Sequence, residues 1–114
     1  MATMEHITLK GKNGNQYVFS VHSIDYECRE EGGIYIYTKR TPMLGLGGNH
    51  VLIYIGRTDS FVRRNYEHDN HPCITSHEPN RICLMREGNE QKRIAIEKDI
   101  LLANNTSCNI QHNS

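Results

Sequence analysis

Two short runs of β-branched and aromatic residues constrain this chain more than any other feature. The first run is IYIYT at residues 34–38, and the second is HVLIYI at residues 50–55. Such side chains favour extended backbone because they pack well on a pleated surface. The intervening residues 41–49 contain Pro42 and three glycines, which predicts a loop. We therefore expect the two runs to form an antiparallel hairpin with a long tip.

A second hairpin is expected near the N-terminus. Residues 7–10 and 16–21 flank the dipeptide Asn13-Gly14. This dipeptide is typical of a type I′ turn, in which both central residues have a positive φ. A further short strand is predicted at residues 81–86.

Two helices complete the expected order of elements. Thr58 or Asp59 is a suitable N-cap for the first helix, and Pro72 sets its latest end. Asn89 caps the second helix, which is expected to end near Asn104. The order hairpin, hairpin, helix, strand, helix is typical of an α+β fold in which helices cover a small, mostly antiparallel sheet.

Composition excludes several classes of protein. The 114 residues suit one small domain, and 13 Lys and Arg balance 13 Asp and Glu, so bulk positive charge does not drive binding to nucleic acid or membranes. No apolar run reaches the length of a spanning helix, and the N-terminus lacks the apolar core of a signal peptide. We therefore expect a cytoplasmic protein that binds no membrane. The four cysteines form no CxxC pair, which favours reduced thiols, with two disulfides as the alternative.

Charge is nonetheless unevenly distributed along the chain. Residues 33–66 contain five basic side chains and one acidic side chain. Arg64, His68 and His71 are spaced i, i+4, i+7, and on one side of a helix they could bind phosphate or form an ordinary solvated face. Glu97 lies in the apolar stripe of the second helix. A carboxylate there needs a metal ion, an arginine or access to water, because burying it unpaired is costly.

The two predicted strands also carry a pair of tripeptides that resembles a known family. Gly33-Ile34-Tyr35 is followed on the next strand by Tyr54-Ile55-Gly56, as in the GIY-YIG nuclease family. Further positions match the family's pattern in the right order, namely Arg57, Arg64, His68, Glu97 and Asn109. The similarity spans residues 33–109. Two departures are a longer spacer between the tripeptides and Thr106, which stands where many members have a proline.

The resemblance implies an endonuclease that hydrolyses DNA phosphodiester bonds with one divalent metal, Mg²⁺ or Mn²⁺, held by Glu97. It also implies that Arg64, supported by Arg57, clamps the scissile phosphate. Tyr35 is expected to be the general base and Tyr54 its partner, and the two roles could be exchanged. A phenol has an unperturbed pKa of about 10. We expect the cationic surroundings to lower that pKa toward neutrality.

The remaining parts of the chain receive roles under the same interpretation. His68 would relay a proton or bind phosphate, and Asn109 would orient the site through hydrogen bonds. The catalytic domain would comprise residues 32–110, preceded by a hairpin with an acidic extension (1–31) that packs on the same domain, and followed by a polar tail (111–114). DNA is the expected partner. Because the chain carries no appended sequence-reading module, the N-terminal region, a homodimer or a partner protein would supply specificity.

Two other functions stay open at this point. The first is a nucleic-acid-binding or interaction domain of the same fold that has no catalytic activity. The second is a small zinc-binding module, whose ligands within residues 68–77 would be His68, His71, Cys73 and His77. Their H-x2-H-x-C-x3-H spacing matches no common structural zinc pattern.

Overall fold

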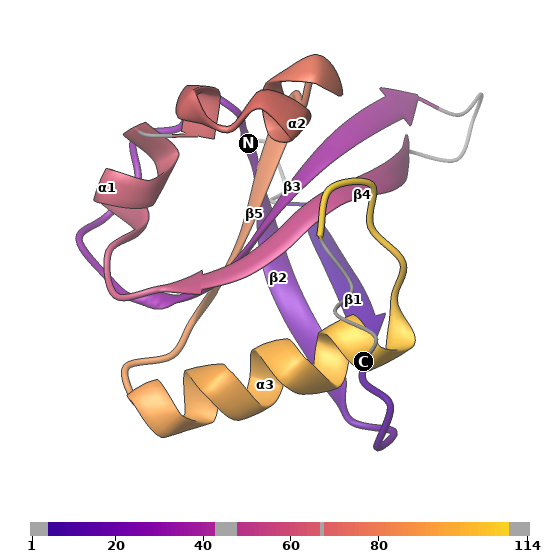
Figure 1. The fold of residues 1–114 in the computed structure, drawn as a ribbon, viewed down its shortest axis with the longest axis vertical. Helices are drawn as coiled ribbons and strands as arrows, with labels where there is room; N and C mark the ends of the chain where they lie inside the picture. The colour runs from indigo at the N-terminus through magenta and orange to yellow at the C-terminus, as the bar shows by residue number, and fades with distance from the viewer. Residues whose placement is uncertain (1–4, 43–47, 67, 110–114) are drawn as a thin grey trace.

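The computed structural model describes residues 5–42, 48–66 and 68–109, which form one α+β unit (Figure 1). The strands are β1 (His6–Lys10), β2 (Gln16–Ser23), β3 (Gly33–Pro42), β4 (Gly48–Thr58) and β5 (Arg81–Arg86). The helical segments are α1 (Phe61–Tyr66), the 3-10 turn η1 (His68–Asn70), α2 (Pro72–Ser76) and α3 (Glu90–Ala103). This order confirms the expected α+β architecture. None of the described helices has the length and apolar character needed to cross a membrane.

The strands form a single antiparallel sheet in the order β1-β2-β5-β3-β4. β3 lies between β4 and β5, and the N-terminal hairpin joins the same sheet because β2 pairs with β5. The β3–β4 ladder continues as far as the pair Pro42 and Gly48. The connection is therefore shorter than the loop expected at residues 41–49, and its tip at residues 43–47 lies outside the described residues.

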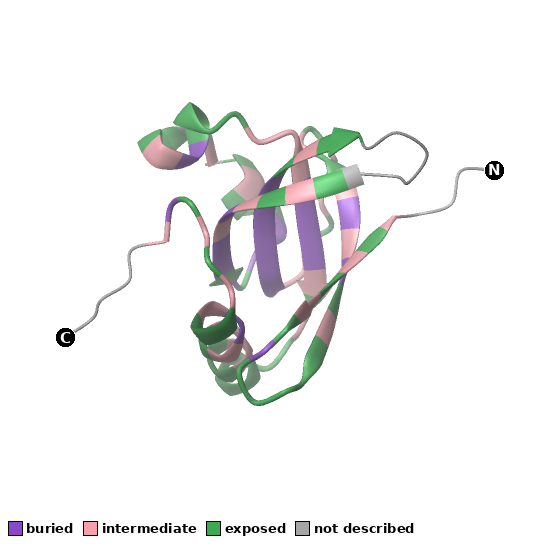
Figure 2. Cartoon of the chain, turned by 90° about the vertical axis from the view of Figure 1, so that its right-hand side faces the viewer, coloured by how far each residue is buried: buried purple, intermediate pink, exposed green. Residues whose placement is uncertain are grey.

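Side chains of β3 alternate between two hydrophobic clusters, one on each face of the sheet, because successive strand residues point to opposite sides. Ile34 and Ile36 join a cluster that contains Ile100 of α3. Tyr35 and Tyr37 join the other cluster, which includes residues of α1 and α2. Figure 2 shows this buried centre as purple strands with the outer side of α3 exposed. Complete burial of a side chain such as Ile100 contributes about 1.5–3 kcal/mol to folding.

α3 begins and ends close to the predicted residues. The side chain of Asn89 accepts a hydrogen bond from the amide of Lys92 at 2.9 Å, as an N-cap does. At the other end, Nδ2 of Asn104 donates to the carbonyls of Ile100 (2.9 Å) and Lys10 (3.0 Å). These bonds tie the end of α3 to the end of β1, so the helix stays close to the sheet.

The turn of the N-terminal hairpin differs from the predicted type I′ turn. The connection comprises residues 11–15, and among its described residues only Gly14 has a positive φ, at 93°. The amide of Asn13 donates to Oδ1 of Asp99 in α3 at 3.0 Å. This bond to another element selects a longer connection, in which one left-handed residue is sufficient. The predicted hairpin is confirmed, and the predicted turn type is wrong.

The first predicted helix is broken into two short segments, α1 and η1, and α2 begins only at Pro72, so Arg64, His68 and His71 do not share one helix. α1 begins at a different cap from the expected one, because the hydroxyl of Ser60 accepts the hydrogen bond of the Arg63 amide at 3.1 Å. In a continuous helix the carbonyl of Asn65 would bond to the amide four residues later. Here that carbonyl accepts a 2.6 Å hydrogen bond from Nδ1 of His68, and the chain turns.

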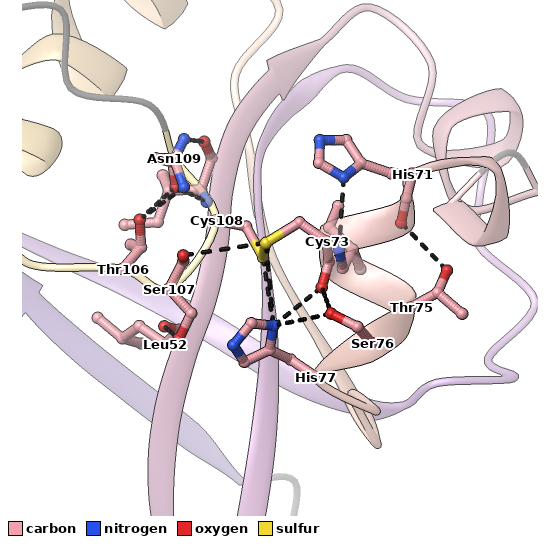
Figure 3. The surroundings of a disulfide bond; sticks show 12 residues. Leu52, His71, Cys73, Thr75, Ser76, His77, Thr106, Ser107, Cys108 and Asn109 are labelled. Carbon is pink, nitrogen blue, oxygen red and sulfur yellow. Dashed lines mark hydrogen bonds between the residues drawn. A yellow bond between two sulfur atoms is a disulfide. The ribbon is translucent and has the colours of Figure 1, made fainter.

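The segment after α3 covers the outer edge of β4. The amides of Ser107 and Cys108 donate to the carbonyls of Leu52 (3.1 Å) and Ile53 (2.8 Å). A disulfide joins Cys108 to Cys73 of α2 (Figure 3). The expectation of reduced thiols is therefore wrong for this pair, because the fold places the two residues together although 35 positions separate them in the sequence. Cys28 and Cys83 are free.

Reduction of the Cys73–Cys108 disulfide is expected to lower the free energy of unfolding by about 3–4 kcal/mol, because a cross-link across a 35-residue separation restricts the unfolded chain. Urea denaturation of the wild type with and without a reductant, in the presence of a chelator, measures the loss. The Cys73→Ser variant is the control, since its stability should not respond to reductant. Equal stability of the oxidised and reduced wild type would contradict the prediction.

Candidate active site at the edge of the sheet

Tyr35 reaches from the centre of the sheet toward its β4 edge. It lies on β3, only 2% of it is exposed, and it pairs with Gly56 of β4. A Cβ atom added at Gly56 would overlap the Tyr35 hydroxyl and ring. The phenol can therefore cross β4 only because position 56 has no side chain. This contact gives a physical reason for the glycine of the second tripeptide.

Tyr54 stands beside Tyr35 on the neighbouring strand. The ring centroids are 6.1 Å apart with an interplanar angle of 29°. Tyr54 is half-buried, and its other neighbour is His71, whose ring centroid is 5.3 Å away. The structure thus brings the two motif tyrosines together and adds His71, which the sequence placed on a solvated helix face or in a zinc site.

Arg64 approaches Tyr35 from α1. Its guanidinium carbon lies 5.8 Å from the centre of the Tyr35 ring, within the range of a cation–π contact. The residue is exposed and forms no salt bridge with any residue that the structure describes. Arg64 is therefore a cation at the Tyr35 ring that pairs with none of the described carboxylates.

Glu97 approaches the same edge from α3. Its Oε1 accepts a hydrogen bond from Nη1 of Arg57 at 2.5 Å, and 17% of the glutamate side chain is exposed. An arginine therefore satisfies the carboxylate that the helix pattern marked as out of place. Within the described part of the chain, Oε2 of Glu97 has no hydrogen-bond donor. This open carboxylate oxygen is the kind of ligand that Mg²⁺ prefers, and one such ligand is common when phosphate oxygens complete the coordination.

The environment raises the pKa of Tyr35 well above its ordinary value of about 10, contrary to the expected lowering. Burial is the main cause, because it disfavours the charged phenolate. The proximity of Tyr54 and Glu97 raises the pKa further, and the guanidinium of Arg64 lowers it. Of the cations expected to act on the phenol, only Arg64 lowers its pKa, and the loss of solvent around the ring outweighs that effect.

His68 lies beside Tyr37, whereas Asn109 is bound to the backbone of β4. The ring of His68 stacks on Tyr37 at 5.3 Å rather than on Tyr35 or Tyr54. Since a carbonyl can only accept, Nδ1 of His68 carries the proton of its bond to Asn65. Asn109 binds the backbone of Ile55 with both side-chain atoms, accepting from its amide and donating to its carbonyl, each at 2.8 Å. Asn109 therefore orients the strand that carries Tyr54.

A basic groove of about 340 Å³ adjoins these residues. Its lining consists of Arg57, Thr58, Asp59, Arg63, Arg64, Glu90 and Arg93. Four arginines at one groove form a surface suited to phosphate groups, because guanidinium binds phosphate oxygens through two parallel hydrogen bonds. Sequence reasoning missed Arg93. The signal was its i, i+4 spacing from Glu97, which puts both side chains on one side of α3.

The zinc set proposed from the sequence does not assemble. His68 lies on Tyr37, and Nδ1 of His71 accepts a hydrogen bond from the amide of Ile74 at 3.4 Å. Cys73 and His77 are close together, and their third neighbour is Cys108. The arrangement therefore keeps Cys73 and His77 together and places His68 and His71 elsewhere.

No family model, curated protein or solved structure matches the chain. A function must accordingly be argued from the residues and their geometry. The ladder joins the two tripeptides at one pair, Tyr35 with Gly56, and the tyrosine of the second tripeptide pairs with Tyr37. Tyr54 of β4 and Arg64 of α1 lie beside the Tyr35 ring, and Glu97 of α3 is held nearby through its ion pair with Arg57 of β4.

Tyr35 is expected to ionise above the ordinary phenol value, and Arg64→Gln is expected to raise its pKa further, because the substitution removes the charge that favours the phenolate. NMR of protein carrying ¹³Cζ-labelled tyrosine measures the titration, with Tyr35→Phe to assign the signal. Lys39→Gln removes an exposed charge elsewhere on β3 and should leave the titration unchanged. A Tyr35 pKa below about 10 would refute this description of the site.

Proposed function

We propose that the protein is a metal-dependent DNA endonuclease of the GIY-YIG type. The observation that carries the proposal is that Tyr54 and Arg64 flank the ring of Tyr35, while Arg57 of the neighbouring strand holds the Glu97 carboxylate at the same edge of the sheet. Hydrolysis of a phosphodiester needs a base for water, cations for the phosphate and charge at the leaving oxygen. Tyr35, the arginine groove and the Glu97 carboxylate correspond to these three tasks.

The arginines would bind the DNA backbone. Arg64 can take a phosphate without breaking a salt bridge within the described residues, since it holds no carboxylate there. Arg57 holds Glu97, and a phosphate in the groove offers its guanidinium a second anionic partner. Binding of substrate would then draw Arg57 toward the phosphate and leave the carboxylate free. Phosphate contacts fix position and carry no sequence information, so target choice would come from a second copy or a partner protein.

Tyr35 is the better candidate for the general base, because it is the tyrosine on which both Arg64 and Glu97 act. Its raised pKa has a kinetic consequence. Only a small fraction of the phenol is ionised near neutral pH. As long as the pH is below the pKa, that fraction increases about tenfold for each unit by which the pH rises. Tyr54, next to it on β4, would position the water or the phosphate, and Asn109 would hold the Tyr54 strand in place through Ile55.

Glu97 would hold the divalent ion. Its open carboxylate oxygen suits Mg²⁺ or Mn²⁺, which bind oxygen ligands and are often held by one or two carboxylates together with substrate phosphate. When bound, the ion would supply positive charge to the scissile phosphate and to the leaving oxygen. The protein's own contribution is the position of the carboxylate on α3, one helical turn from Arg93 of the groove.

A second candidate function is DNA binding without cleavage, and two observations favour it. Arg57 already neutralises Glu97, and burial keeps Tyr35 protonated. A domain with those properties retains the arginine groove and has no active base. Binding of DNA without any cleavage in Mg²⁺ or Mn²⁺ would support this candidate and refute the endonuclease.

Supercoiled plasmid is expected to be nicked in the presence of Mg²⁺ and to stay intact with EDTA. Glu97→Gln should abolish nicking and leave the fold unchanged, whereas Glu27→Gln makes the same substitution at an exposed residue and should be fully active. The wild-type rate should rise about tenfold per pH unit between roughly pH 7 and 9, because Tyr35 titrates above that range. An active Glu97→Gln variant would remove this mechanism.

DNA affinity is expected to depend steeply on salt. Each phosphate contact contributes about 0.9 to the slope of log affinity against log salt concentration, so Arg64→Gln should lower the slope by about that amount. Fluorescence anisotropy of a labelled duplex in EDTA measures binding without cleavage. Lys39→Gln, which lies outside the groove, is the control. An unchanged slope for Arg64→Gln would exclude Arg64 from the binding surface.

A further inference from the structure

Three soft metal ligands meet away from the proposed active site, at the junction of α2 and the C-terminal segment. Figure 3 shows the imidazole of His77 directed at the sulfur atoms of Cys73 and Cys108. Nδ1 of His77 lies 3.9 Å from Sγ of Cys73 and 3.6 Å from Sγ of Cys108. In a tetrahedral zinc site with Zn–S near 2.3 Å and Zn–N near 2.0 Å, nitrogen and sulfur ligands are about 3.5 Å apart. The imidazole is therefore close to ligand distance from Cys108 and within about half an ångström of it from Cys73.

We infer that the reduced protein binds one Zn²⁺ through Cys73, His77 and Cys108. Two thiolates and an imidazole form a donor set that prefers Zn²⁺ and takes no Mg²⁺. Three protein ligands leave the fourth position of a tetrahedral ion to water. The site is separate from Glu97 and does not depend on the proposed nuclease activity.

The backbone holds the two sulfurs together without the disulfide. Cys73 and His77 are one helical turn apart at α2, so their side chains share one side of that helix. Cys108 is held from the opposite direction, because its amide donates to the carbonyl of Ile53 at 2.8 Å. The side chain of Asn109 binds Ile55 on the same strand. Reduction therefore releases two thiols that remain neighbours.

The exchange of disulfide for metal balances in atoms and electrons. A phosphine reductant with one water gives two thiols from the disulfide and becomes a phosphine oxide. Zn²⁺ then binds both sulfurs as their two protons leave for the solvent. Nδ1 of His77, which now donates to the carbonyl of Cys73 at 2.9 Å, loses its proton while Nε2 gains one, so the imidazole stays neutral. Both the disulfide and the proposed zinc–ligand bonds connect the C-terminal segment, which includes Asn109, to α2.

The test is zinc binding by the folded protein after reduction with a phosphine, measured by competition with a chromophoric chelator. The wild type is expected to bind one Zn²⁺ per chain when reduced and none when oxidised. Cys108→Ser should lose the site, and His77→Gln, which keeps both cysteines, should weaken binding by more than about tenfold, since loss of even an outer-shell partner has that effect. Co²⁺ in place of Zn²⁺ should show thiolate charge-transfer absorption.

Two controls separate this site from the rest of the molecule. Cys28→Ser removes a free thiol elsewhere and should bind Zn²⁺ like the wild type. Glu97→Gln should also bind it normally, whatever its effect on DNA cleavage. The inference is overturned by a reduced wild type that binds no Zn²⁺, by a disulfide that the phosphine leaves intact in the folded protein, or by binding that persists in Cys108→Ser.

Discussion

The passage of the Tyr35 phenol across Gly56 is the contact on which the candidate site depends. It requires a strand pairing that sets Tyr35 opposite Gly56, and it requires the absence of a side chain at that position. Once both conditions hold, a residue from the centre of the sheet reaches the edge, where α1 and α3 can also contribute side chains. A substituent at position 56 would overlap the Tyr35 ring and hydroxyl and displace the phenol from this place.

β4 is the outer strand of the sheet, so its free side is open both to the site residues and to other chains. An edge strand exposes unpaired amides and carbonyls, which favour association with other chains. Here the C-terminal segment forms hydrogen bonds with the β4 backbone between Leu52 and Ile55, through Ser107, Cys108 and Asn109. The disulfide from Cys108 to Cys73 holds this segment in place. The protection stops before Gly56, which is where the tyrosines, Arg57 and Glu97 gather. The C-terminal segment thus covers the free side of β4 from Leu52 to Ile55, and the candidate site lies at the uncovered part that begins at Gly56.

Local signals in the sequence predicted the elements that depend on local structure. The strand runs, residues 81–86 and the Asn89 cap gave correct elements. Among the predicted site residues, Tyr54 and Arg64 lie beside Tyr35, and Arg57 pairs with Glu97. Two of the errors concern contacts between distant residues: the turn changes because Asp99 binds Asn13, and the disulfide spans 35 positions. Neither contact leaves a pattern within a short window of sequence. The third error is local, because His68 takes the carbonyl of Asn65 three residues before it, and the helical spacing of the charged residues gave no sign of this side-chain bond.

The direction of the Tyr35 pKa shift shows the same limit in energetic terms. Counting charges near a phenol predicts a stabilised phenolate, whereas the depth of the ring in the core decides the outcome. Under the proposed function, the burial that keeps Tyr35 protonated despite the nearby Arg64 has a role before substrate binds. A buried, protonated phenol and an Arg57–Glu97 ion pair leave neither Tyr35 nor Glu97 with an uncompensated negative charge before substrate binds. A phosphodiester in the arginine groove adds negative charge beside Arg57 and competes for it, and Glu97 is then available to a cation. The substrate would thus complete the site that acts on it.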